Sequence, residues 1–221
     1  MKMKKYIKPI MFAVGASTIT GSMVYYSFKE EIVRNNLEIY IIKLKIGNAI
    51  YVRTPEDKRI LINGGYNSSI INEVGELMPF YSHRIDTVVS TSVDKNKLGG
   101  LIPVLERYPV EKVIIPKYNI YNLFIASSSD PVYRAFNDTL NNNKVKDVIE
   151  VVEGTYVDLS PSVRLETLFP LEPKKFKYNK MSDPEIFFNL SYSGKNFIYI
   201  GGASNKIQNI MGDAWLSGRS E

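Results

Sequence analysis

The stretch TSVDKNKLGG, residues 91–100, follows the apolar run IDTVVS and ends in a double glycine. In enzymes, a loop that joins a buried strand to a helix commonly carries the catalytic groups. The polar side chains spaced along this loop are Ser92, Asp94, Asn96 and Lys97. Only Asp94 is a ligand that divalent cations favour, and an ammonium group such as that of Lys97 repels a nearby cation. The loop therefore has the setting of a metal site but lacks its ligands.

The rest of the composition narrows the chemistry further. The chain has no cysteine, which excludes disulfides, thiolate nucleophiles and Cys-ligated zinc. It has a single histidine, His83, whereas zinc and di-metal hydrolases normally use several imidazoles. His83 is expected on the surface, because no serine or carboxylate partner is spaced to work with it. Ser92 lacks a G-x-S-x-G context and is expected to cap the loop rather than act as a nucleophile.

The net charge of +5 and pI of about 9.1 suggest an acidic partner such as nucleic acid, but the first eight residues hold four of the lysines. Without them, 24 basic residues face 23 acidic ones, so the body has no general basic bias. One exception is KKFKYNK, residues 174–180, which interleaves basic and aromatic side chains. A solvated hairpin loop and a DNA contact both fit this segment. The candidate contact residues are Lys174, Lys175, Phe176, Lys177 and Tyr178.

The N-terminus predicts export. Residues 1–8 form a basic cytoplasmic flank, and residues 9–28 are twenty uncharged residues, enough to cross a bilayer as a helix. This segment is expected to be a transmembrane anchor, with a cleaved signal peptide and a buried soluble helix as alternatives. Residues 29–36 read as a linker to a domain over 37–221. The domain is thus expected to be extracytoplasmic on a single-pass anchor, or secreted after cleavage.

The body mixes strands and helices. Its opening runs predict three antiparallel strands at 37–47, 48–54 and 59–65. Strands at 84–91 and 110–116 then alternate with helices at 68–81, 98–109 and 130–143, which favours a layered α/β arrangement. The second half predicts strands at 147–152, 155–160, 163–170, 186–194 and 196–202.

Taken in order, five stretches of this chain resemble the metallo-β-lactamase fold, and most closely its DNA-uptake competence-protein (ComEC-type) branch. The stretches are IKLKIGNAIYV, LINGG, IDTVVSTSVDKNKLGGL, IFFNLSYSG and FIYIGGAS, and the similarity runs from about Leu37 to about Ser204. The branch shows LDVGQGDAILI, LIDGG, THpDaDHiGGl, NxxSLVLRLxYG and fLLtGDa at these places. The resemblance implies an αββα sandwich, and the apolar frame and glycines of the pattern are retained.

The ligand positions implied by the resemblance are not retained. Ser92, Asn96 and Lys97 stand where the pattern has His, Asp and His, and only Asp94 keeps a ligand-capable side chain. Asn48, Asn63 and Gly202 each replace an Asp. Lys97 is expected to form an ion pair with Asp94 that occupies the position where the metal ions would bind. The final His-bearing segment is also missing, so the fold is expected to be incomplete at its C-terminus.

These features predict a membrane-anchored pseudo-hydrolase with no metal or other cofactor. It would act by binding DNA or an envelope protein, or as a structural subunit, and an open sheet edge could also let copies of the chain associate. The alternative is a competence-type hydrolase or phosphodiesterase whose active site is rebuilt around Asp94.

Overall fold

The computed structural model describes residues 36–79, 83–117, 130–142, 145–171 and 185–201. The chain divides into two compact units, Met1–Asn36 and Leu37–Glu221. All the helices and strands described below belong to the second unit.

A six-stranded mixed sheet forms the centre of this unit. Its strands are β1 (Glu38–Lys43), β2 (Asn48–Arg53), β3 (Arg59–Ile62), β4 (Ile85–Val89), β5 (Val110–Pro116) and β6 (Asp147–Val151), in the order β1-β2-β3-β4-β5-β6. The pairs β1–β2 and β2–β3 are antiparallel, as expected for the opening strands. From β3 to β6 all pairs are parallel, which requires the helical crossovers that the alternating pattern predicted.

The second sheet comes from the later part of the chain and is fully antiparallel. Its strands are β7 (Tyr156–Ser160), β8 (Val163–Phe169), β9 (Phe187–Tyr192) and β10 (Lys195–Tyr199), in the order β10-β9-β8-β7. One face of this sheet packs on the first sheet through an apolar core that includes Ile50, Ile62, Val89, Leu165 and Phe188. The two sheets therefore form a sandwich.

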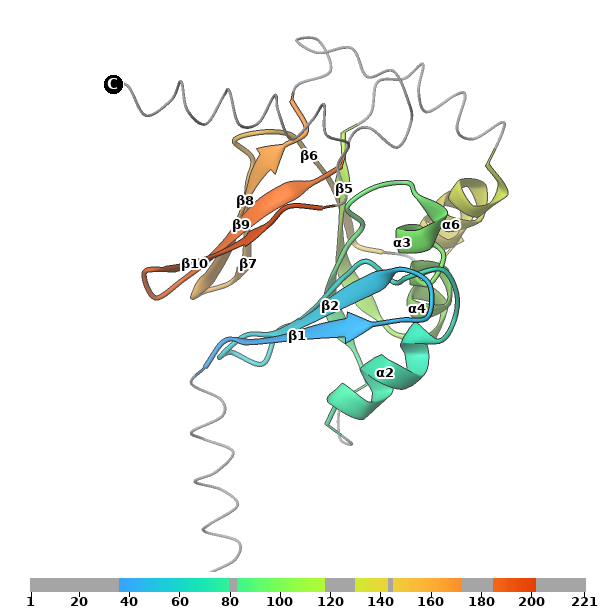
Figure 1. The fold of residues 1–221 in the computed structure, drawn as a ribbon, viewed down its shortest axis with the longest axis horizontal. Helices are drawn as coiled ribbons and strands as arrows, with labels where there is room; N and C mark the ends of the chain where they lie inside the picture. Colours follow the sequence, from blue (N-terminus) through green and yellow to red (C-terminus); the bar gives the residue numbers. More distant parts are fainter. Residues whose placement is uncertain (1–35, 80–82, 118–129, 143–144, 172–184, 202–221) are drawn as a thin grey trace, which may run out of the picture. The chain divides into compact units, whose positions relative to one another are not determined.

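Helices cover the other face of the six-stranded sheet, as Figure 1 shows. They are α2 (Ile70–Leu77), α3 (Lys95–Leu98), α4 (Leu101–Arg107) and α6 (Pro131–Asn142). Their apolar residues, among them Val74, Leu101, Val104 and Phe136, pack with the sheet in a second core. The described residues thus form three layers: helices, mixed sheet and antiparallel sheet.

Two helices differ from the sequence prediction. The helix expected over 68–81 is α2, whose last residue is Leu77. The helix expected over 98–109 begins later, as α4 at Leu101, because Leu98 ends the separate helix α3 and the glycines at 99 and 100 lie between the two helices against the chain that follows β3. By contrast, the strand predicted at 110–116 is β5 with the same bounds.

The outer face of the antiparallel sheet is polar over β7 and β8. Arg164 and Asp158 form an ion pair there at 2.6 Å, and the Tyr156 hydroxyl donates to Glu166 at 3.0 Å. These side chains are exposed or half-exposed. The second helical layer of the expected αββα sandwich is not among the described residues.

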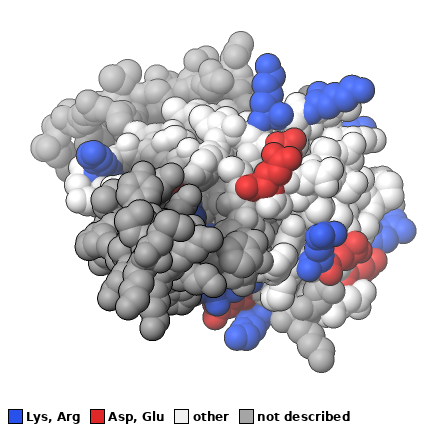
Figure 2. All heavy atoms as spheres, turned by 90° about the horizontal axis from the view of Figure 1, so that it is seen from below, with Lys and Arg blue, Asp and Glu red and all other residues white. Residues whose placement is uncertain are grey.

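The described residues include no helix that is long and apolar enough to span a membrane. The segment predicted to do so, residues 9–28, lies outside the described part of the chain, as do the flank at 1–8 and most of the linker at 29–36. On the face drawn in Figure 2, basic and acidic side chains lie interspersed, and the described residues form no broad patch of one sign.

Candidate functional site

The backbone around the predicted loop is held by two pairs of glycines. The amide of Gly64, just after β3, donates to the carbonyl oxygen of Lys97 at 2.7 Å, and the amide of Gly100 donates to that of Gly65 at 2.9 Å. A Cβ added at Gly100 would overlap the carbonyl oxygen of Gly64. The glycines are therefore needed for this backbone contact whether or not the loop binds a metal.

Asn63 ties the ends of three strands together. It is buried and adopts a φ of 60°, in the left-handed region that asparagine tolerates better than most residues. Its Oδ1 accepts hydrogen bonds from the amide and the hydroxyl of Thr91, both at 3.0 Å. Its Nδ2 donates to the hydroxyl of Tyr199 at 3.2 Å. Asn63, predicted as a degenerate ligand position, thus acts as a polar crosslink between the two sheets.

The side chains at the start of the loop shape its backbone. Ser92 is 1% exposed, and its Oγ accepts from the amide of Asp94 at 3.3 Å, so it is the capping hydroxyl that the sequence predicted. Asp94 is the N-cap of α3, and its Oδ1 accepts from the amide of Asn96 at 2.8 Å. The one ligand-capable side chain of the loop is thereby used as a helix cap.

Lys97 forms an ion pair with Glu185, the residue two positions before β9. The side chains are 14% and 5% exposed, so the pair is largely removed from water. The expected pairing of Lys97 with Asp94 is wrong, because Asp94 turns its carboxylate to the amide of Asn96 while Lys97 extends towards β9.

The position of Glu185 is fixed from both sides. The next residue, Ile186, donates its amide to the carbonyl oxygen of Thr91 at 2.7 Å, which joins the start of β9 to the loop after β4. Gly201, two residues after β10, lies against the carboxylate so closely that an added Cβ would overlap Oε1 of Glu185. The carboxylate is therefore enclosed between α3 and the chain that leaves β10.

Glu185 was not among the site residues predicted from the sequence. A signal was present, since Glu185 is an acid directly before the apolar residues 186–188, but the nearer Asp94 was the more obvious partner for the ammonium group of Lys97. Charge complementarity between the two segments could have linked them, but no local spacing rule does.

Other predicted residues are not part of this cluster. His83 is exposed, as expected, and lines a hollow of about 440 Å³ beside α2 with Arg107 and Tyr108. Asn48 is exposed at the start of β2. Gly202 and the candidate DNA contacts Lys174, Lys175, Phe176, Lys177 and Tyr178 lie outside the described residues.

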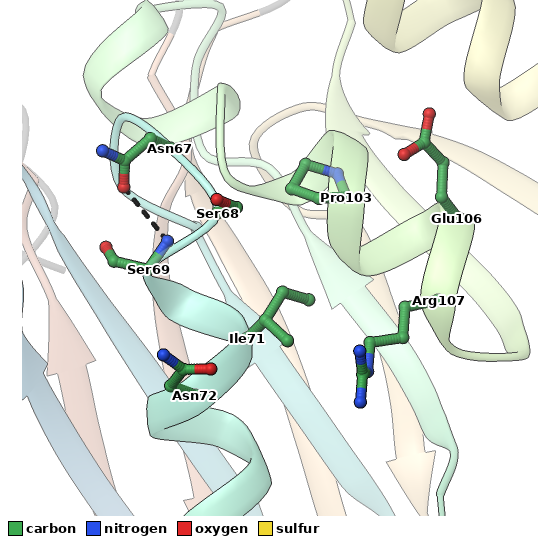
Figure 3. A pocket seen from close by; sticks show the side chains of 8 residues that line it. All are labelled: Asn67, Ser68, Ser69, Ile71, Asn72, Pro103, Glu106 and Arg107. Carbon is green, nitrogen blue, oxygen red and sulfur yellow. Dashed lines mark hydrogen bonds between the residues drawn. The ribbon is translucent and has the colours of Figure 1, made fainter.

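A second hollow, of about 590 Å³, lies between α2 and α4 (Figure 3). Asn67, Ser68 and Ser69 line it at one end and Glu106 and Arg107 at the other, with Ile71 between them. The Oδ1 of Asn67 accepts a hydrogen bond from the amide of Ser69 at 3.1 Å, so some polar groups that line the hollow already bond to each other. None of the predicted site residues that the structure describes lines this hollow.

The residues around Lys97 do not fit a divalent metal. Asp94 is engaged as a cap, Glu185 is neutralised by Lys97, and Asn63 has its amide committed to Thr91 and Tyr199. Within the described ranges there is no group of three or more His, Cys, Asp or Glu side chains that could hold a metal ion. A zinc or di-metal centre needs three or four such ligands around each ion.

Comparisons with solved structures identify the fold. A protein from Thermotoga maritima assigned as a metallo-β-lactamase superposes with a TM-score of 0.51 at 13% identity, covering 80% of this chain and 91% of that one. A metallo-β-lactamase mutant from Cronobacter sakazakii, described by a HARLDQ motif, gives 0.52 at 15% identity, with 75% of this chain and 60% of that one covered. A further mutant of that protein gives 0.52 at 14% identity, covering 83% and 73%.

No family model and no curated protein sequence matches the chain. The structural likeness is at low identity and therefore shows the fold alone: the described domain has a metallo-β-lactamase-type fold.

Proposed function

We propose that this chain is a non-hydrolytic protein of metallo-β-lactamase fold, in which the ion pair of Lys97 and Glu185 stands in place of the metal centre, and that it acts by binding a partner. The observation that carries the proposal is the position of this pair. It joins the loop after β4, where the resemblance expects metal ligands, to the start of β9.

The chemistry of the pair supports a replacement of metal by lysine. A metal ion in such a fold balances the charge of carboxylates from several loops and ties those loops together. The ammonium group of Lys97 balances the carboxylate of Glu185 and joins the loop after β4 to the start of β9, but it is attached to the chain and cannot polarise a water as a divalent ion does. The arrangement keeps the structural role of a metal and loses its catalytic one.

The proposal also assigns the chain to a membrane-tethered, extracytoplasmic setting related to the ComEC-type branch. This part is supported by the sequence alone, through the basic flank at 1–8, the uncharged segment at 9–28 and the five ordered motifs. Fractionation of cells that express the tagged full chain tests it. Recovery of the chain from the soluble cytoplasmic fraction would contradict the membrane tether.

The partner is proposed to be DNA or an envelope protein. The DNA version is supported by KKFKYNK, whereas the interspersed charges in Figure 2 offer no broad basic patch on that face. Binding of a labelled duplex to the full chain should weaken with salt and with Lys174→Glu plus Lys175→Glu. If neither change weakens it, an envelope protein becomes the proposed partner.

The deciding experiment is a metal and activity measurement on the full chain purified without chelator. We expect mass spectrometry to find zinc and manganese far below one ion per chain, and a phosphodiesterase assay with added Mn²⁺ and Zn²⁺ to show no turnover. The competing function is a hydrolase rebuilt around Asp94. Near-stoichiometric metal would contradict the loss of the metal site, and turnover that is abolished by Asp94→Asn would establish the hydrolase instead.

A further inference from the structure

The β1 strand forms an open edge of the six-stranded sheet. Among the described residues no strand pairs with its outer side. Its six residues pair with β2 in unbroken register from Glu38 to Lys43, without a bulge, and it contains no proline. Natural edge strands usually carry a bulge, a proline or an inward-pointing charge that prevents pairing with another chain. This edge lacks the first two and has charges only at its ends.

The middle of β1 is apolar and exposed. Ile41 is 72% exposed and Tyr40 is 38% exposed, and they lie on opposite faces of the sheet because side chains alternate along a strand. The neighbouring Ile39 is half-buried against the core between the sheets. A strand added at this edge would cover apolar surface on both faces.

A hollow of about 400 Å³ runs along this edge. Residues Ile39–Lys43 line one side, and Glu73, Glu76 and Leu77 of α2 line the other. The hollow therefore offers an added strand both the backbone of β1 and a helical wall.

The helical wall carries negative charge. Glu73 and Glu76 are exposed, and within the described part of the chain neither carboxylate has an ion-pair partner. Leu77 lies beside them and is half-buried. Long basic side chains would suit this wall, since their aliphatic stems cover apolar surface while their charged ends meet carboxylates.

We propose that the edge of β1 is a docking site for an extended segment of a partner protein in which Lys or Arg alternates with apolar residues. The segment would add a seventh strand through backbone hydrogen bonds to β1. Its basic side chains would face Glu73 and Glu76, and its apolar side chains would lie beside Ile41 on the other face.

The charges disfavour a second copy of this chain as the occupant. Two copies that pair through β1 in antiparallel fashion would be related by a two-fold axis perpendicular to the sheet. Their α2 helices would then lie on the same face of the joint sheet, with Glu73 and Glu76 of each copy directed towards those of the other. Like charges brought together in this way oppose association.

The test uses the full chain in mild detergent and three fluorescent eight-residue peptides. One alternates Lys and Val, one alternates Glu and Val, and the third is the Lys–Val peptide with every backbone nitrogen methylated. We expect saturable binding of the first peptide only, because the second reverses the charge and the third cannot donate the hydrogen bonds of a strand.

Charge-reversed variants complete the test. Glu73→Lys with Glu76→Lys should weaken binding of the Lys–Val peptide about tenfold or more, whereas Glu106→Lys, an exposed reversal on α4, should leave it unchanged. Equal binding of the methylated peptide, or no effect of the double reversal, would overturn the proposal. It would also be overturned if light scattering gave a dimer that Ile41→Asp converts to a monomer, because a second copy would then occupy the edge. None of these outcomes depends on the metal content that tests the proposed function.

Discussion

Lys97 and Glu185 lie 88 positions apart in the sequence and form a largely buried ion pair that joins α3 to the start of β9. Such a pair is costly to desolvate, so its presence alone does not imply a net gain in stability. What it does imply is coupling: each charge is tolerated in the interior because the other is present.

The first prediction follows from this coupling. Replacing one partner, as in Lys97→Met or Glu185→Gln, leaves the other without its ion-pair partner and should lower the free energy of unfolding by about 3 kcal/mol. The double variant Lys97→Met with Glu185→Leu should lose clearly less free energy of unfolding than the sum of the losses in the two single variants. Urea unfolding followed by circular dichroism measures all three variants.

The exposed pair Arg164–Asp158 provides a matched control. Its side chains are 58% and 65% exposed, so Arg164→Met should leave the unfolding curve nearly unchanged. Additive losses in the Lys97 and Glu185 double variant would show that the two side chains do not depend on each other, and would remove the main support for the proposed function.

The second prediction concerns the restoration of ligands. The triple variant Ser92→His, Asn96→Asp and Lys97→His recreates the residue types that the resemblance expects in the loop and releases the carboxylate of Glu185. After incubation with zinc and dialysis, this variant should retain far more zinc than the natural chain, because imidazole and carboxylate replace an ammonium. Alanine at the same three positions is the control. Equal zinc in the natural chain and the triple variant would contradict the account of Lys97.

The third prediction contrasts two glycines. Gly100→Ala should destabilise the domain strongly, because the new methyl group would overlap the carbonyl oxygen of Gly64. Gly75→Ala, in the exposed part of α2 with nothing within 4 Å of the added atom, should stabilise it by up to about 1 kcal/mol. Thermal unfolding of both variants checks the contrast. A neutral Gly100→Ala would show that the glycine contact does not define the loop.

The sequence predicted much of the fold because its signals are local. The bounds of β5 follow from a run of β-branched residues that ends at a proline, and the capping role of Ser92 follows from the turn chemistry of its loop. The break between α3 and α4 is different, since Gly99 and Gly100 both fit a helical pattern, and the two helices end and begin where these glycines pack against residues 64–66. That contact is tertiary and has no local signature.

The candidate site could be predicted only in part, because some of its features are local in sequence and others depend on tertiary contacts. The loss of ligands at Ser92, Asn96 and Lys97 could be read from their types, but the true partner of Lys97 could not. Asp94 was nearer in sequence, yet a carboxylate that begins a helix gains more from capping the amide of Asn96. The pairing with Glu185 depends on how the two sheets pack, which the sequence pattern does not specify.

The last prediction concerns alkaline pH. Burial raises the pKa of Tyr51 to about 12, and its hydroxyl has no hydrogen-bond partner among the described residues. The unfolded chain releases this proton near its ordinary pKa of 10.0, so between about pH 10 and 12 the unfolded state binds fewer protons than the folded one. Stability should therefore fall as the pH rises through this range, by about 2 kcal/mol from Tyr51 alone.

Tyr51→Phe removes the hydroxyl whose ionisation favours the unfolded state. The variant should therefore lose less stability than the natural chain between pH 9 and pH 11, as measured by urea unfolding at each pH. Near neutral pH it should match or exceed the natural stability, because a buried hydroxyl without a partner is costly. Tyr66→Phe, at an exposed tyrosine, serves as the control and should leave the alkaline loss unchanged. An equal alkaline loss in the Tyr51 variant would mean that its hydroxyl finds water or a partner in the folded protein.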